Sequence, residues 1–309
     1  MPRNSSARRS LLTTTLAVTG AAVVLATTLL TGADGPTAGE RASPARPGRQ
    51  ATEADRLLHD AEQRLLRDCM RRHGFTYQVF PLDEDPGIKA FAYVLDDAGW
   101  ARRHGYGAEL RRERAALVRN DPNRAYFAGL SAERKAEALV AANGDSPDGL
   151  TVRLPGGGTV RRSDRGCVAE AQQRLYGNVG AWFRASTRVG ALEQMRRSRV
   201  LADPAYLERL GPWRQCMRRA GHDYATPAAA RAAALSTARP LSREHEVGLA
   251  LAEARCAGES ALGRTSRRLD DHHGRLLAHA YRTDVEVRER LRAAALPRAR
   301  RVLGADPRD

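Results

Sequence analysis

Apolar residues recur every three to four positions along most of the chain, a spacing that places them on one face of an α-helix. In residues 53–73 this stripe consists of Leu58, Ala61, Leu65 and Cys69. Thr52 is suited to cap the start of such a helix, and Gly74 to end it in a left-handed conformation. The pattern therefore predicts a helix over 53–73.

Capping residues and Asp-Pro pairs predict further helices. We expect them over 107–119, from Asp121-Pro122, from Ser131 to Asn143, from a cap at Ser163 with Cys167 near the helix start, and from Ser242 almost to Leu296. The last segment should break near 258–263 or at Gly274, and its seven-residue leucine spacing (Leu262, Leu269, Leu276) indicates packing within the fold more than a coiled coil. Gly211-Pro212 should interrupt the helix that opens at Asp203-Pro204.

Strand patterning is clearest over 151–161, where Thr-Val-Arg-Leu and Thr-Val-Arg flank Pro155-Gly156-Gly157-Gly158. This arrangement predicts a small β-hairpin with a glycine turn. A phosphate-binding loop would require a Gly-Lys-Ser/Thr ending and a following helix, and neither is present. A short strand is also expected at either end of 75–95.

A nine-residue motif occurs twice: Cys69-Met-Arg-Arg-His-Gly-Phe-Thr-Tyr77 and Cys216-Met-Arg-Arg-Ala-Gly-His-Asp-Tyr224. The other two cysteines also have similar surroundings, since Cys167 and Cys256 are each followed by Glu at the third position. We therefore predict a mainly α protein, a disulfide-stapled helical bundle of two diverged units with a small β-hairpin. The units are expected over 52–200 and 201–309.

The N-terminal segment has the organisation of a secretory signal over 1–33: Arg3, Arg8 and Arg9, then an uncharged stretch, then small residues up to Ala33. Cleavage after Ala33 would leave a secreted protein. An uncleaved membrane anchor is the alternative, and an ordinary basic start is favoured over a twin-arginine signal. Residues 34–51 read as a disordered linker.

An exported chain with an even number of cysteines favours disulfides. Four cysteines allow three pairings, and the repeat selects Cys69 with Cys167 and Cys216 with Cys256. We predict no metal site and no cofactor, because the chain has no Cys-x-x-Cys pair and we find no histidine at zinc-ligand spacing from a cysteine.

The formal net charge of +15 comes almost entirely from arginine, since lysine occurs only at Lys89 and Lys135. A basic exported protein is attracted to anionic envelope polymers or to a membrane surface. Dispersed charge with few aromatic residues gives no specific nucleic-acid signature. The charge alone leaves the oligomeric state unknown.

Catalytic motifs are incomplete. His245-Glu246 begins like a zinc-protease helix but lacks the second histidine, and Ser260 lacks the Gly-x-Ser-x-Gly context. The remaining candidates are the acidic pairs Asp96-Asp97 and Asp270-Asp271 and the histidines His272, His273 and His279. Adjacent helical residues point apart, so neither acidic pair forms a ready acid–base pair.

Three segments carry a resemblance to known proteins: the Cys-Met-Arg-Arg-x-Gly-x-x-Tyr motif, Trp100-Ala-Arg-Arg-His-Gly-Tyr-Gly107 and Ser163-Asp-Arg-Gly-Cys167. The chain resembles secreted proteins of Streptomyces and related actinobacteria that have no established activity. The resemblance implies a compartment and no site. We therefore expect an exported, non-enzymatic binding or structural protein of the envelope, with an envelope hydrolase built from scattered carboxylates and histidines as the alternative.

Overall fold

Helices dominate the computed structural model, which describes residues 52–80 and 88–304. The predicted signal segment and linker lie outside the described residues. The elements in chain order are α1 (Glu53–Arg72), α2 (Ala98–His104), α3 (Ala108–Arg119), α4 (Pro122–Gly129), α5 (Ala132–Asn143), β1 (Gly149–Arg153), β2 (Thr159–Ser163), α6 (Cys167–Tyr176), α7 (Val179–Ala202), α8 (Pro204–Arg219), α9 (Pro227–Ala234), α10 (Arg243–Glu259), α11 (Leu262–Ala280) and α12 (Arg282–Gly304). The predicted fold class, mainly α with a small hairpin and two disulfides, is confirmed.

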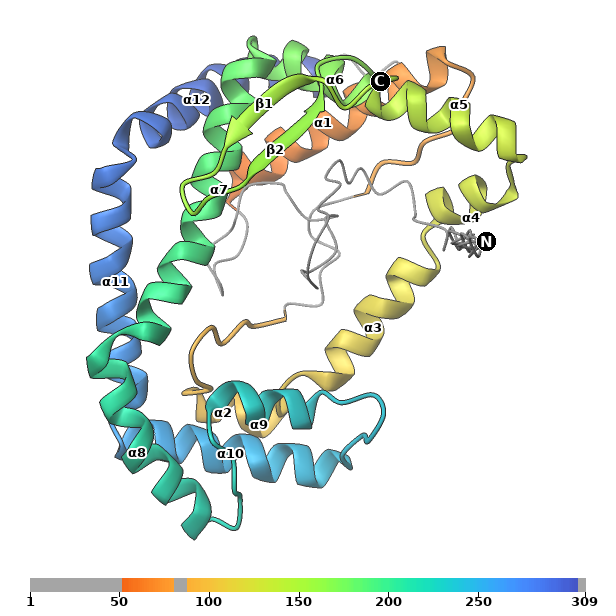
Figure 1. Cartoon of the computed structure of the whole chain (residues 1–309). Coiled ribbons are helices and arrows are strands. Elements are labelled where there is room, and N and C mark those ends of the chain that lie inside the picture. The colour runs from red at the N-terminus through yellow and green to blue at the C-terminus, as the bar shows by residue number, and fades with distance from the viewer. Residues whose placement is uncertain (1–51, 81–87, 305–309) are drawn as a thin grey trace, which may run out of the picture.

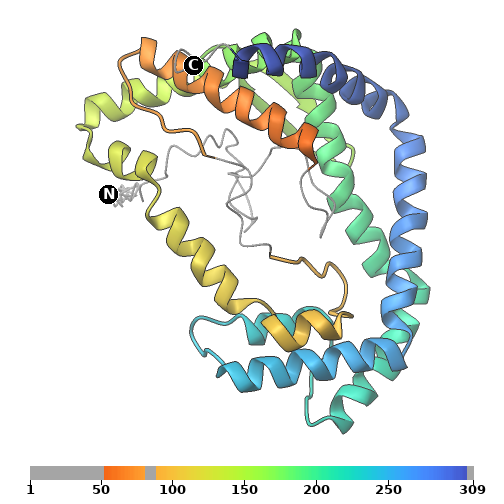
Figure 2. The same ribbon diagram turned by 180° about the vertical axis from the view of Figure 1, so that it is seen from behind.

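Two groups of helices lie at opposite ends of the molecule (Figure 1). One group contains α1, α5, α6 and α12, and the other contains α2, α8, α9 and α10. Helices α7 and α11 run side by side between the groups along one edge, and α3 runs along the opposite edge. The view from behind shows α1 and α12 crossing the same end of the molecule (Figure 2).

Each end has its own hydrophobic core. The first core lies between α1, α5, α6 and α12, and its buried residues include Leu58, Leu65, Cys69, Cys167, Leu175, Ala295 and Ala299. The second core lies between α2, α8, α9, α10 and the start of α11, and its buried residues include Leu95, Trp100, Tyr106, Trp213, Cys216, Leu249, Cys256 and Leu262. Helix α7 contributes Trp182 to the first core and Val200 to the second.

These cores do not follow a boundary at residue 200. Residues 94–106 precede the predicted boundary but pack in the second core, and α12 follows it but packs in the first. Each end of the molecule therefore contains segments from both predicted units. Neither core is built from a continuous stretch of chain, which ties both ends into one structure.

Helix α1 starts and ends as its sequence predicts. Thr52 and Asp55 form a reciprocal capping box, with Asp55 N donating to Thr52 Oγ1 at 3.1 Å and Thr52 N donating to Asp55 Oδ2 at 3.0 Å. At the other end Gly74 has φ +76°, and Phe75 N donates to Met70 O at 3.0 Å. Gly221 has φ +84° at the equivalent position after α8. The two repeats thus share one helix-terminating geometry.

The hairpin pairs β1 with β2 in antiparallel register, with Val152 opposite Val160. Both valines are buried and pack against Phe183 of α7, while Arg153 and Arg161 lie on the exposed face. The predicted hairpin is confirmed and extends slightly beyond 151–161.

The short strands expected at either end of 75–95 are wrong for the described part of that range, which is irregular. Side chains from other elements, and not a neighbouring strand, form hydrogen bonds with backbone groups of this segment. The amide of Asn123 accepts from Gln78 N at 2.7 Å and donates to Gln78 O at 2.9 Å. Farther along, Leu95 N donates to the carboxylate of Glu253 at 2.8 Å.

The predicted cap at Ser163 is also wrong. Ser163 ends β2, where its Oγ accepts from Arg165 N at 3.1 Å, and Gly166 is the residue before α6. A Cβ on Gly166 would lie 2.4 Å from Gly144 N, so the close approach of two backbone segments requires glycine there. Residues 163–166 therefore form a turn between β2 and α6, where the sequence pattern had placed the start of the helix.

One predicted helix break is absent and one is present. Helix α8 continues through Pro212, because Trp213, Cys216 and Met217 beyond it are all buried in the second core. Helix α11 continues through Gly274. The break falls at Ser260–Ala261, inside the predicted range 258–263, and Ala261 takes a left-handed φ of 58° there. A second break, which was not predicted, separates α11 from α12 at Tyr281.

No helix within residues 52–80 and 88–304 is long and apolar enough to cross a membrane.

Candidate functional site

The two disulfides join Cys69 to Cys167 and Cys216 to Cys256, which is the pairing that the repeat predicts. The Cα–Cα distance is 5.5 Å in both. All four residues are almost fully buried, Cys69 and Cys167 in the first core and Cys216 and Cys256 in the second. Such bonds persist in oxidising compartments, so the pair indicates an extracytoplasmic protein.

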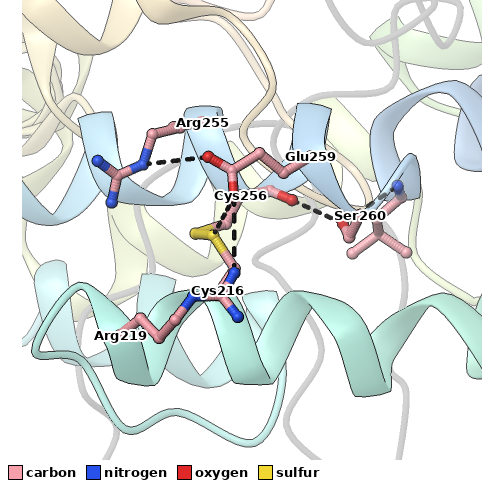
Figure 3. Close-up of a disulfide and its surroundings, with 7 residues drawn as sticks. Cys216, Arg219, Arg255, Cys256, Glu259 and Ser260 are labelled. Atoms are coloured by element: carbon pink, nitrogen blue, oxygen red, sulfur yellow. Dashed lines mark hydrogen bonds and ion pairs between the residues drawn. A yellow bond between two sulfur atoms is a disulfide. The ribbon is translucent and has the colours of Figure 1, made fainter.

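An ion pair accompanies each disulfide at the same offset from its cysteines. Arg219 and Glu259 follow Cys216 and Cys256 by three positions, and their charged groups lie 3.7 Å apart (Figure 3). In the first unit, Arg72 and Glu170 follow Cys69 and Cys167 by three positions and lie 2.5 Å apart. The repeat therefore includes Cys-x-x-Arg on one helix and Cys-x-x-Glu on the other.

In each unit the glutamate also lies against the disulfide. Oε2 of Glu259 lies 3.3 Å from Cys216 Sγ, and Oε2 of Glu170 lies 3.3 Å from Cys69 Sγ. A disulfide sulfur carries no hydrogen, so these are contacts and not hydrogen bonds. The ion pairs are substantially exposed, and exposed pairs contribute little to stability.

A buried carboxylate network was missed by the sequence patterns. Glu253 of α10 is fully buried in the second core, where it accepts hydrogen bonds from Leu95 N and from the Tyr106 hydroxyl. Burial raises the pKa of Glu253 to about 7, while the two hydrogen bonds and Arg231 act in the opposite direction. The network fastens residues 95–106 to α10.

Glu246 lies about two turns before Glu253 on α10 and has a similar role. Its Oε1 accepts from Tyr106 N at 2.8 Å and from Ala108 N at 3.1 Å. A Cβ on Gly105 would lie 2.8 Å from that carboxylate oxygen. Glu246 therefore binds the backbone just after α2, which gives this residue of the His245-Glu246 pair a structural explanation.

The other sequence candidates are dispersed. Ser260 donates to Cys256 O at 2.6 Å within its own helix end. Asp97 caps α2 through Trp100 N at 2.9 Å, and Asp96 pairs with Arg267. Asp270 accepts from the Tyr93 hydroxyl, while its neighbour Asp271 is exposed. These polar groups hold segments together and do not converge on a single point.

The three histidines of α11 do not meet either. His273 lies 3.0 Å from Asp203 and its hydrogen bond lowers the pKa of that carboxyl, whereas His272 and His279 are exposed. Among the described residues, the one potential metal-ligand group is Cys69, His73 and Cys167, whose ligand atoms lie within 4.8 Å of one another. His73, the C-cap residue of α1, follows Cys69 by four positions and was missed from the sequence.

A small apolar pocket opens beside the end of α1. Its lining consists of Met70, Phe75, Thr76, Tyr77, Asn123, Tyr126, Phe127 and Ala138, and its cavity volume is about 20 Å³. That volume holds about one water molecule. The lining contains no carboxylate or histidine, so it offers no acid–base pair.

A basic stripe lies along the exposed side of α11. We define the α11 stripe as Arg264, Arg268, His272, Arg275 and His279, which are all exposed. Their spacing of three or four residues aligns them over about 22 Å of helix. The opposite side of α11 is buried through Leu262, Leu269 and Leu277.

The arginines of this stripe are available for external partners. Among the described residues, no ion pair engages Arg264, Arg268 or Arg275, in contrast with Arg267, which pairs with Asp96. Asp271 is the one acidic residue exposed between them. The stripe was not recognised from sequence because arginine is abundant on every helix, and only the packing of α11 on α7 and α8 shows which face remains open.

No protein-family model, curated protein or solved structure matches the chain.

Proposed function

We propose that this protein is an exported, non-enzymatic binding or structural protein of the cell envelope or extracellular space, and that the α11 stripe binds linear anionic polymers. The observation that carries the proposal is the alignment of three unpaired, exposed arginines on a helix whose other face is fixed in the fold. Regularly spaced guanidinium groups match the repeated phosphates of an envelope phosphodiester polymer.

A polymer fits this surface better than a lipid bilayer does. A helix that lies in a membrane interface needs a continuous apolar face to insert among the acyl chains. In α11 the leucines Leu262, Leu269 and Leu277 are buried inside the protein, and Leu276 is the exposed leucine. The open face therefore offers charge without an insertable surface.

The alternative, an envelope hydrolase, has less support. Hydrolysis needs ionisable groups gathered at a cleft that admits substrate. Burial raises the pKa of two described carboxyls, Glu193 of α7 and Glu253 of α10. Glu253 lies inside the second core and accepts hydrogen bonds from Leu95 N and Tyr106. Its surroundings favour a structural role, and the binding role remains our conclusion.

Retention on immobilised teichoic acid, measured against salt concentration, tests the proposal. The variant Arg264→Gln/Arg268→Gln/Arg275→Gln lowers the formal charge from +15 by three, to +12. The matched control Arg153→Gln/Arg161→Gln/Arg214→Gln loses the same charge from exposed positions outside the stripe. We expect the stripe variant to lose most binding and to reduce the slope of log affinity against log salt by about 2, while the control changes little.

Equal losses in the two variants would show that net charge alone drives retention. Salt-independent retention, or none, would remove the proposal. Anionic vesicles serve as the comparison surface, and tighter binding to vesicles than to the polymer would contradict the choice of a polymer.

A further inference from the structure

We propose that the dithiol form of the first unit binds one Zn²⁺ ion through Cys69, His73 and Cys167, and that the second unit lacks this site. The inference is independent of the proposed function. It rests on one geometric difference between two otherwise matched disulfide environments.

The three ligand atoms already lie close together. The sulfur atoms of Cys69 and Cys167 and a ring nitrogen of His73 all lie within 4.8 Å of one another. In a tetrahedral zinc site with 2.3 Å zinc–sulfur bonds, the two sulfurs are about 3.8 Å apart. Opening the disulfide and rotating the two side chains reaches that separation without moving the helices.

Two helix ends place these ligands. Cys69 and His73 are one turn apart at the end of α1, so their side chains lie on the same face. The amide of His73 donates to Met70 O at 3.1 Å, and Gly74 then turns the chain away. Cys167 is the first residue of α6, which packs across α1.

The second unit is a natural control for this geometry. It has the same cysteine separation, the same positive-φ glycine and the same Arg-Glu ion pair. Ala220 occupies the position equivalent to His73. Two thiolates without an imidazole at this position make a much poorer zinc site, so the second unit lacks the third ligand.

Zinc binding to the newly made chain requires no external reductant. The chain is synthesised with thiols, and the dithiol form therefore precedes the disulfide. When Zn²⁺ binds, two thiols lose their protons to solvent and the neutral imidazole donates a lone pair. Glu170 lies 3.3 Å from Cys69 Sγ but pairs with Arg72 and is not part of the ligand group, so a water molecule would complete the fourth position.

The occupied site would hold α1 and α6 in the arrangement that the disulfide later fixes. Such a metal-bound dithiol protects the pair from joining the wrong cysteine. A disulfide-bearing oxidant of the export compartment then accepts the two electrons and becomes a dithiol, the two thiolates join in the sulfur–sulfur bond, and the ion is released. The second unit, without a histidine, would depend on oxidation alone.

Cobalt titration of the full chain, reduced with a phosphine and kept free of oxygen, tests the proposal. Thiolate-to-cobalt charge-transfer absorption reports binding, and circular dichroism reports helix content. We expect one equivalent of Co²⁺ per chain, displaced by Zn²⁺. His73→Ala should weaken binding at least about tenfold, the loss that even outer-shell partners cause.

Two further variants make the test decisive. Cys216→Ser/Cys256→Ser should retain the full cobalt signal, and Ala220→His should add a second equivalent. Two equivalents in the unsubstituted chain, no charge-transfer band, or binding unaffected by His73→Ala would overturn the proposal. If reduction unfolds the chain, cobalt should restore helix only when His73 is present, and restoration in its absence, or none, also counts against it.

Discussion

Tyr106 donates its hydroxyl hydrogen bond to Glu253 inside the second core, where both side chains are hidden from solvent. The same carboxylate accepts from Leu95 N at 2.8 Å. Glu253 of α10 thus binds both Leu95 and Tyr106, which lie more than half the length of the described chain away in sequence. The surroundings that set the protonation state of Glu253 therefore exist only in the folded protein.

Stability should decrease as the pH rises through the titration range of Glu253. Its folded pKa is about 7 against an ordinary value of 4.5, so between these values the folded state retains a proton that the unfolded state has lost. That contribution is fully present below the ordinary pKa and disappears as the pH approaches the folded pKa. It amounts to roughly 3 kcal/mol.

Denaturant unfolding from pH 4 to 8 measures this slope. Glu253→Gln should flatten it, because the amide keeps the shape and does not titrate. Glu259→Gln, on the exposed ion pair, serves as the control and should leave the slope unchanged. Identical slopes in all three proteins would show that Glu253 titrates normally in the folded state.

The ion pairs beside the disulfides should contribute little. Both partners are well exposed in each, with side-chain exposures of 51% and 40% for Arg72 and Glu170 and of 62% and 50% for Arg219 and Glu259. Arg72→Gln and Arg219→Gln should each lower the free energy of unfolding by less than about 1 kcal/mol. A loss of several kcal/mol at low salt would indicate a coupled network instead.

The disulfides should contribute far more. In the chain-entropy model, loops of 98 and 40 residues stabilise the folded state by about 5 and about 4 kcal/mol. Replacing Cys69 and Cys167 together by Ala, or Cys216 and Cys256 together, should lower the free energy of unfolding by amounts of this order. Chemical denaturation under oxidising conditions measures both, and a loss below about 1 kcal/mol in either would contradict the model.

Gly221→Ala should be destabilising by about 1 kcal/mol. The φ of +84° is unfavourable for a residue with a Cβ, although that Cβ would meet nothing within 4 Å. Gly211→Ala, inside α8, is the matched control, because the added Cβ also meets nothing within 4 Å and no positive φ opposes it. It should stabilise the protein by up to about 1 kcal/mol. Thermal unfolding of both variants checks the opposite signs.

Local features of the fold were predictable wherever they depend on neighbouring residues. Thr52, Asp121 and Ser131 cap helices as expected, because a capping side chain binds backbone only two or three positions away. The disulfide pairing followed from the repeat, which preserves spatial relationships between distant cysteines. The helix bounds at Asn143 and Arg119 also agree with the pattern.

Features that depend on distant contacts were not predictable. Pro212 does not break α8, because buried residues on its far side hold the helix in place. Glu253 resembles any surface glutamate of a helix until Tyr106 and Leu95 meet it across the fold. The arginines of α11 became distinctive only when packing buried the opposite face, and His73 only when α6 brought Cys167 beside it.

The packing of α12 against α1 has a consequence for how the chain is made. The first core contains residues near both ends of the described chain, among them Leu58 and Ala299. A ribosome must therefore have synthesised α12 before α1, the first described helix, acquires its final partner. Until then part of the apolar face of α1 stays uncovered, so the first core cannot close before α12 is made, and any truncation that removes α12 should yield an aggregation-prone chain.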